Sequence, residues 1–220
     1  MRSHNNSVLT LNGSSSCIKV PLHAVEPSLL LLFSGKVDNI GTQSCEEKNN
    51  TVWTIGHSTR PLEEFIAMLI SFNIEIVADI RSFPGSRKFP QYNKEALEVS
   101  LAKNTIQYIH LKSLGGRRKM MPNSKNTGWR HVAFRGYADY METDAFSQGI
   151  RELEKMAFKQ RTAYLCAEAV WWRCHRSLVS DYLKIRNWKV MNIISIGKDV
   201  EHTYTAPARI INGKLNYEKE

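Results

Sequence analysis

The chain has 220 residues, of which 42% are hydrophobic and 23% are charged, and this suits one globular domain or one domain with an appendage. Four cysteines are too few for a disulfide scaffold, and the apolar run LLLLF at residues 29–33 is far too short for a membrane span, which needs roughly 20 residues. The formal net charge of +9 lies wholly within residues 51–220, which points to nucleic acid or a phosphorylated small molecule as a partner, or to charge spread over the surface for solubility.

Residues 1–50 differ from the rest of the chain in composition and in hydrophobic periodicity. The segments SHNNSVLTLNGSSS and SCEEKNN are rich in Ser and Asn, and no helical or strand period persists in them. We expect a poorly ordered leader with one docked apolar patch at Leu29–Phe33, followed by a single domain over residues 51–217. The low cysteine content favours a cytoplasmic protein, and we expect no membrane association.

From Thr51 onward, apolar runs alternate with segments of helical periodicity. We expect buried strands within residues 51–58, 75–86, 106–119, 161–168 and 189–197. We expect helices within residues 61–73, 93–104, 136–158 and 174–187, a long polar and aromatic loop over 117–141, and a small hairpin turned by Asn212–Gly213 within 203–217. This order predicts an α/β fold whose mostly parallel five-stranded sheet is flanked by helices in a three-layer, Rossmann-like arrangement, with a small C-terminal hairpin-like addendum.

Polar and reactive side chains follow four of these expected strands. Because parallel α/β sheets bind ligands beyond the carboxyl ends of their strands, we expect these side chains to converge on one site. The candidates for binding a ligand or anion are His57, Ser58, Asp79, Arg81, Gly115, Gly116, Arg117, Arg130, Arg173 and Arg176. The candidates for stacking on an aromatic ligand are Trp129, Tyr137 and Trp171.

The candidate catalytic residues lie in the stretch LCAEAVWWRCHRSLVSDYL, residues 165–183, and are Cys166, Glu168, Cys174 and His175. Cys174 precedes an expected helix, whose free N–H groups and positive dipole end lower the pKa of a nearby thiol and attract anions. Glu168 and His175 are candidates for acid–base catalysis.

Each candidate also has a purely structural interpretation. Cys166 is a packed core thiol if its strand is buried, and Asp79 with Arg81 forms an ion pair that only braces the strand end. Trp171 covers the core if it does not stack on a ligand. Glu168 is the hardest to assign to structure alone, because a carboxylate just after a buried strand must be hydrated, paired or functional.

We predict no cofactor and no metal ion. The spacing C-x7-C-H differs from the usual zinc pattern, and adjacent side chains on a helix point about 100° apart, which makes joint ligation by Cys174 and His175 awkward. The outline C-x6-R from Cys166 to Arg173 is that of a rhodanese or phosphatase loop, but the intervening residues lack the glycines that form an anion cradle.

The chain resembles the domain-of-unknown-function family 488, and the resemblance extends from about residue 51 to residue 217. It is carried by the segments TIGHSTRPLEEF, DIRSFPGSRKFPQYN, YIHLKSLGGRRK, NTGWRHVAFRGYADYM, CAEAVWWRCHRSLVSDYL and TAPARIINGKLNY. The resemblance implies no activity. It does imply a motif set that overlaps the strand-end candidates, namely His57, Ser58, Asp79, Arg81, Gly115, Gly116, Cys166, Glu168, Cys174, His175 and Arg176.

Three functions remain open at this point. The favoured one is an enzyme that acts on a phosphorylated or nucleic-acid substrate through the Cys, His, Glu and Arg side chains. The second is a nucleic-acid-binding protein without catalysis, in which the cysteines are structural. The third is a sulfur-transfer or thiol redox protein in which Cys166 and Cys174 exchange a persulfide or a disulfide.

Overall fold

The computed structural model describes residues 8–13, 16–21 and 50–219. Two units can be distinguished, Met1–Cys45 and Glu46–Glu220, and each is described by itself. In the first unit, β1 (Val8–Gly13) and β2 (Ser16–Pro21) form an antiparallel hairpin. These two strands were not predicted from the sequence. The remainder of the expected leader, including the patch at Leu29–Phe33, lies outside the described residues.

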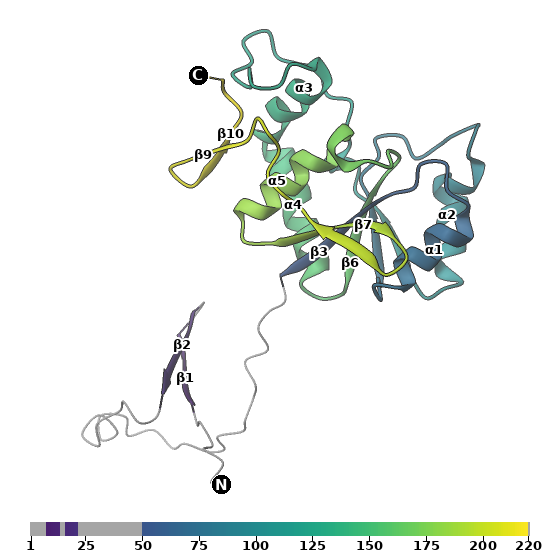
Figure 1. The fold of residues 1–220 in the computed structure, drawn as a ribbon, viewed down its shortest axis with the longest axis horizontal. Helices are drawn as coiled ribbons and strands as arrows, with labels where there is room; N and C mark the ends of the chain where they lie inside the picture. Colours follow the sequence, from purple (N-terminus) through teal and green to yellow (C-terminus); the bar gives the residue numbers. More distant parts are fainter. Residues whose placement is uncertain (1–7, 14–15, 22–49, 220) are drawn as a thin grey trace. The chain divides into compact units, whose positions relative to one another are not determined.

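The second unit is built on a six-stranded sheet (Figure 1). Its strands are β3 (Thr51–Gly56), β4 (Ile76–Asp79), β5 (Gln107–His110), β6 (Thr162–Cys166), β7 (Lys189–Ser195) and β8 (Lys198–Glu201). Their order in the sheet is β5-β4-β6-β3-β7-β8, and β3 to β7 pair in parallel, which confirms the predicted α/β fold. The edge strand β8 was not predicted. It runs antiparallel to β7, and its sequence KDVE has no continuous apolar run that would reveal a strand.

Helices cover both faces of the sheet. They are α1 (Leu62–Ile70), α2 (Lys94–Ala102), α3 (Val132–Met141), α4 (Asp144–Ala157) and α5 (Arg176–Ile185). Helices α1 and α2 pack on one face, and α3, α4 and α5 pack on the other. Successive side chains of β6 point to opposite faces of the sheet. Leu165 packs in the core under α1, whereas Tyr164 and Cys166 pack in the core under α5. The three-layer arrangement is therefore confirmed.

The expected helix over residues 136–158 is divided into α3 and α4. The side chain of Thr143 accepts a hydrogen bond from the N–H of Phe146 at 3.3 Å and caps the second helix, which explains the break. At the C-terminus, β9 (Arg209–Ile211) and β10 (Lys214–Asn216) form the predicted hairpin, with positive φ at Asn212 and Gly213. None of the helices in the described residues combines the length and hydrophobicity that a bilayer span requires.

The neighbouring strands β3 and β6 continue into helices on opposite faces of the sheet. The chain after β3 enters α1, and the chain after β6 enters α5. Pairing extends beyond the strand ends, because the N–H of His57 donates to the carbonyl of Cys166 and the N–H of Ser58 donates to that of Ala167. The carboxyl ends of the strands are where open α/β sheets bind their ligands.

Candidate active site

A pocket of about 390 Å³ lies beyond the carboxyl ends of β4, β5 and β6. Nine of the residues singled out from the sequence line it: Arg81, Gly116, Arg117, Tyr137, Cys166, Glu168, Arg173, Cys174 and His175. Six further residues that are not among the candidates given above also line it, namely Ser82, Phe83, His131, Ala133, Phe134 and Ala167. Eight candidates do not line the pocket, namely His57, Ser58, Asp79, Gly115, Trp129, Arg130, Trp171 and Arg176. The pocket thus lies where the strand directions predict it, and several of the eight support its walls.

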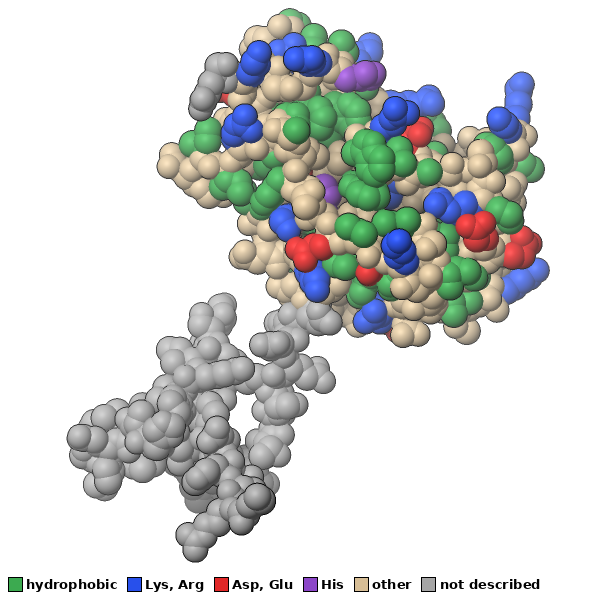
Figure 2. All heavy atoms as spheres, viewed as in Figure 1, with side chains coloured by type: hydrophobic (Ala, Val, Ile, Leu, Met, Phe, Trp, Pro, Cys, Tyr) green, Lys and Arg blue, Asp and Glu red, His purple; other side chains and the backbone are tan. Residues whose placement is uncertain are grey.

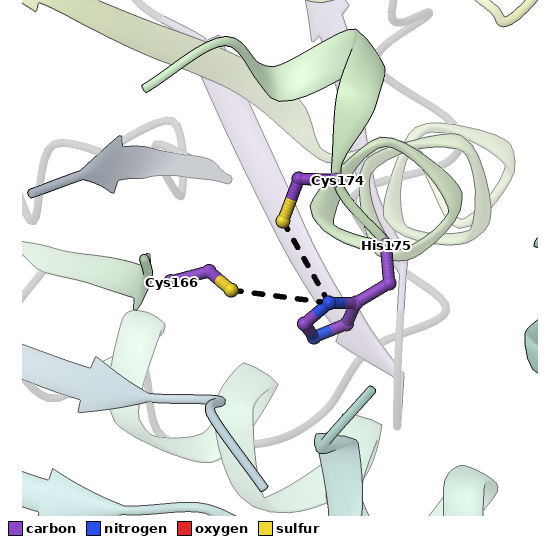
Figure 3. A group of neighbouring side chains, drawn as sticks. All are labelled: Cys166, Cys174 and His175. Carbon is purple, nitrogen blue, oxygen red and sulfur yellow. Dashed lines mark hydrogen bonds between the residues drawn. The ribbon is translucent and has the colours of Figure 1, made fainter. Parts of the chain in front are cut away.

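Two thiols and one imidazole form the inner wall of the pocket (Figure 3). Both sulfur atoms face the same ring nitrogen, since His175 Nδ1 lies 3.6 Å from the Sγ of Cys174 and 3.9 Å from the Sγ of Cys166. Cys166 is the last residue of β6, whereas Cys174 and His175 immediately precede α5. Both cysteines are buried, so this cluster has little contact with water except through the pocket.

A backbone carbonyl fixes which nitrogen of His175 faces the thiols. The Nε2 atom lies 3.2 Å from the carbonyl oxygen of Ile80, just after β4, and only a protonated nitrogen can donate to that oxygen. In the neutral imidazole, Nδ1 therefore carries the lone pair and presents it to the two sulfur atoms. His175 is poised to accept a thiol proton or to act as an electron-pair donor.

The two thiols differ in acidity. Burial opposes ionisation of Cys174, but the hydrogen bond from Cys166 and the proximity of His175 and Arg176 hold its pKa well below the usual range. The hydrogen bond to Cys174, followed by burial, raises the pKa of Cys166 well above its usual range. When one proton leaves the pair, the negative charge therefore lies on Cys174, with Cys166 as the hydrogen-bond donor.

Arg176 is a buried cation at the start of α5, and only 1% of it is exposed. Its guanidinium donates to the hydroxyl of Thr54 at 3.1 Å and to the carbonyl of Glu168. Among the described residues no carboxylate forms an ion pair with it, and its Nε has no hydrogen-bond partner. Since a buried charge is costly when it is not balanced, the thiolate of Cys174 is the negative charge that suits this cation.

Arg81, in contrast, has an acidic partner. Asp79, fully buried at the end of β4, accepts bonds from the backbone N–H and the guanidinium of Arg81 and from the hydroxyl of Tyr108. Although burial disfavours its charge, these bonds raise the pKa of Arg81 above its ordinary value.

Arg81 also donates to Nε2 of His57 at 3.3 Å. Burial, opposed by the bond to Ser58, lowers the pKa of His57 to about 4, so His57 is neutral at pH 7. Asp79 and His57 position Arg81, which alone of the three lines the pocket.

The two glycines after β5 allow close packing at the pocket. A Cβ atom on Gly116 would lie 2.9 Å from Nδ1 of His175, and one on Gly115 would lie 2.6 Å from the hydroxyl of Ser82. Gly116 therefore leaves room for the imidazole at the cluster. The next residue, Arg117, has a φ of 59° and is exposed, with its guanidinium over the ring of Phe83.

Aromatic side chains lie around the pocket in different roles. Tyr137 is buried against the ring of His175 and donates to the carbonyl of Leu114, so it supports the imidazole. Trp129 stacks on Phe134, which lines the pocket, whereas Trp171 packs against its neighbour Trp172. The large exposed ring at the pocket is that of Phe83, 68% exposed, which was not predicted as a site residue. It follows a Ser and precedes Pro84-Gly85 in an irregular segment, where periodicity gives no signal.

A family model described as Domain of unknown function DUF488 matches residues 61–183 of the chain. This stretch is more than half of the chain. The chain belongs to this family. The comparisons with curated proteins and with solved structures found no match.

Every residue that lines the pocket falls within the DUF488 stretch. His57 and Ser58, which follow β3, precede it, and the C-terminal hairpin follows it. In the view of Figure 2, Lys and Arg side chains are spread over the surface of the second unit, with few acidic groups among them. On this face the basic side chains are not gathered into one patch, and at the pocket the net charge of +9 includes the exposed guanidinium groups of Arg117 and Arg173.

Proposed function

We propose that this protein is an enzyme that acts on a phosphorylated substrate, either a nucleotide or a nucleic-acid strand, in the pocket at the carboxyl ends of β4 to β6. One observation carries the proposal: the buried cluster of two cysteine sulfur atoms and an imidazole lines the same pocket as the guanidinium groups of Arg81, Arg117 and Arg173. Guanidinium groups suit phosphate because they donate planar, paired hydrogen bonds.

Different residues of the pocket wall would carry out the reaction and bind the substrate. The thiol of Cys174 has a lowered pKa, and Nδ1 of the neutral His175 ring can accept its proton, after which the imidazolium faces the thiolate. The exposed ring of Phe83 and the partly buried ring of Phe134 offer faces for a nucleobase. A volume of about 390 Å³ suits one small ligand or a single nucleotide of a strand.

Binding is tested with the full chain, a fluorescent single-stranded oligonucleotide and inorganic phosphate as a competitor, by fluorescence anisotropy at low salt. Arg117→Gln and Arg173→Gln should each weaken binding about tenfold, as expected for a lost charge-assisted contact. Arg151→Gln is the matched control, because Arg151 is exposed on α4 and does not line the pocket. Equal affinities for the wild type and the two pocket variants would refute this binding site.

Catalysis is tested separately with Cys174→Ser on a panel of phosphate esters and oligonucleotides. If the protein is an enzyme that reacts through Cys174, the Cys174→Ser variant should lose turnover and still bind the substrate. If the wild type binds but converts no member of the panel, the alternative of a nucleic-acid-binding protein without catalysis is favoured.

The arrangement of the two thiols also supports a second candidate function, sulfur transfer or thiol redox chemistry. The Sγ atoms of Cys166 and Cys174 lie within 4.8 Å of each other and share one imidazole nitrogen. Mass spectrometry would then show a disulfide between these two cysteines after oxidant challenge, or an added sulfur atom after incubation with a sulfane-sulfur donor such as thiosulfate. Unmodified thiols after both treatments would exclude this candidate.

A further inference from the structure

We propose that Cys166, Cys174 and His175 bind a zinc ion whose fourth coordination position opens into the pocket. The three donor atoms, two Sγ and one Nδ1, all lie within 4.8 Å of one another. Two thiolates with one imidazole form a soft donor set that selects zinc over magnesium or calcium. Among the described residues this is the one group of three or more such side chains that could hold a metal ion.

The distances agree with tetrahedral coordination. Bonds of about 2.3 Å to sulfur and about 2.0 Å to nitrogen place these two atoms about 3.5 Å apart at a tetrahedral angle. The corresponding separations from Nδ1 are 3.6 Å to Cys174 and 3.9 Å to Cys166. Movements of a few tenths of an ångström would bring both sulfur atoms to this separation from Nδ1, and the sulfur atoms, which lie within 4.8 Å of each other, would need to lie about 3.8 Å apart.

The surroundings of His175 are those of a metal ligand. Its Nε2–H donates to the carbonyl of Ile80, which fixes the tautomer and directs the Nδ1 lone pair towards the sulfur atoms. Gly116 leaves the space that the ring needs, and Tyr137 packs against the ring. The ring is therefore held in place before any ion arrives.

The backbone conformation corrects the expectation that Cys174 and His175 diverge. That expectation assumed that both residues are helical. Instead, Cys174 is extended, with φ −132° and ψ 147°, and α5 begins only at Arg176. The two adjacent side chains therefore converge, and the spacing C-x7-C-H is workable because Cys166 comes from the strand rather than from the same loop.

Charge balance indicates what occupies the fourth position. Zinc with two thiolates and a neutral imidazole carries no net charge, which leaves the buried guanidinium of Arg176 unbalanced. An anionic fourth ligand, either hydroxide or a phosphate oxygen, would restore neutrality. The choice of phosphate rests on the proposed function, whereas the three protein ligands do not depend on it.

The test uses the full chain without any substrate. Protein purified from zinc-supplemented cells should contain about one zinc ion per chain. After removal of the metal with a chelator, Co²⁺ should restore the visible bands of tetrahedral cobalt and the near-ultraviolet band of cobalt–thiolate charge transfer. Cys166→Ser, Cys174→Ser and His175→Gln should each weaken Co²⁺ binding about 100-fold or more. Cys45→Ser, in the other unit of the chain, is the matched control and should bind as the wild type does.

Wild-type protein that binds Co²⁺ no more tightly than the Cys166→Ser/Cys174→Ser double variant would overturn the zinc site, and this result does not depend on how well the variants fold. Addition of inorganic phosphate to the cobalt protein should shift the visible bands, and unchanged bands would overturn phosphate as the fourth ligand. A protein that takes up no Co²⁺ at the three ligands but still binds the oligonucleotide would refute the zinc site alone. A zinc protein that binds no phosphorylated ligand would refute the proposed function alone.

Discussion

The Asp79–Arg81 pair permits a quantitative prediction, because both partners are buried at the wall of the pocket. Asp79→Asn keeps the size of the side chain but removes the negative charge that faces a guanidinium only 6% exposed. It also replaces an acceptor of the Tyr108 hydroxyl, 2.7 Å away. Removing one partner of a buried ion pair leaves an unbalanced charge and costs about 3–5 kcal/mol. We expect the free energy of unfolding to fall by this amount.

The assay is urea unfolding of the full chain, followed by circular dichroism. Asp79→Asn should lower the midpoint without changing the slope, since the slope reports the surface exposed on unfolding. Glu201→Gln is the control: it breaks an exposed ion pair with Lys184 and should leave the midpoint unchanged. The double variant Asp79→Leu/Arg81→Met should recover much of the loss, because it leaves no charge unpaired. A loss below about 1 kcal/mol for Asp79→Asn, as expected for an exposed pair, would refute the reasoning.

Three further predictions concern the neighbouring side chains. Burial lowers the pKa of His57 from 6.5 to about 4, so unfolding takes up a proton between these values. Stability should fall by about 3 kcal/mol as the pH drops through this window, and His57→Gln should abolish that slope in urea titrations at several pH values. Gly116→Ala should displace the His175 ring and weaken Co²⁺ binding at least tenfold, whereas the exposed Gly85→Ala should not. In metal-free protein, iodoacetamide should alkylate Cys174 at a rate that levels off below the pKa of N-acetylcysteine, and a profile identical to that of N-acetylcysteine would contradict a lowered pKa.

The sheet could be predicted because its central parallel strands β3, β4 and β6 are buried on both faces. Burial on both faces makes each of these strands a continuous apolar run, and segments such as RTAYLCAE stand out even in a single sequence. Strand β8 has one neighbour and one apolar residue, so its register follows from the turn at Gly197 and from pairing with β7. The hairpin at Asn212–Gly213 was predictable because its turn chemistry is local.

Within the site, the sequence indicated the residues but not their roles. Strand direction was enough to place Arg81, Gly116 and Cys166 at one pocket. Whether a polar side chain faces the pocket or supports its wall depends on neighbours across the sheet, which no local pattern specifies. Asp79 is held by a tyrosine from β5, for example, and His57 stacks on Tyr92, 35 positions further along the chain. Both therefore act behind the wall rather than in the pocket.

Assembly of the cluster depends on both local and distant parts of the chain. The chain between Cys166 and His175 supplies every donor atom, so one short segment between β6 and α5 provides the chemistry. That segment is anchored by Arg176, which binds the carbonyls of Glu168 and Ala169 and the hydroxyl of Thr54 on β3. The orientation of the imidazole, however, is imposed from β4 through the carbonyl of Ile80 and from β5 through Gly116. A reactive group that depends on three separate strands is correctly oriented only in the folded sheet, and this dependence connects the stability of the Asp79–Arg81 pair at the end of β4 to the chemistry of the pocket.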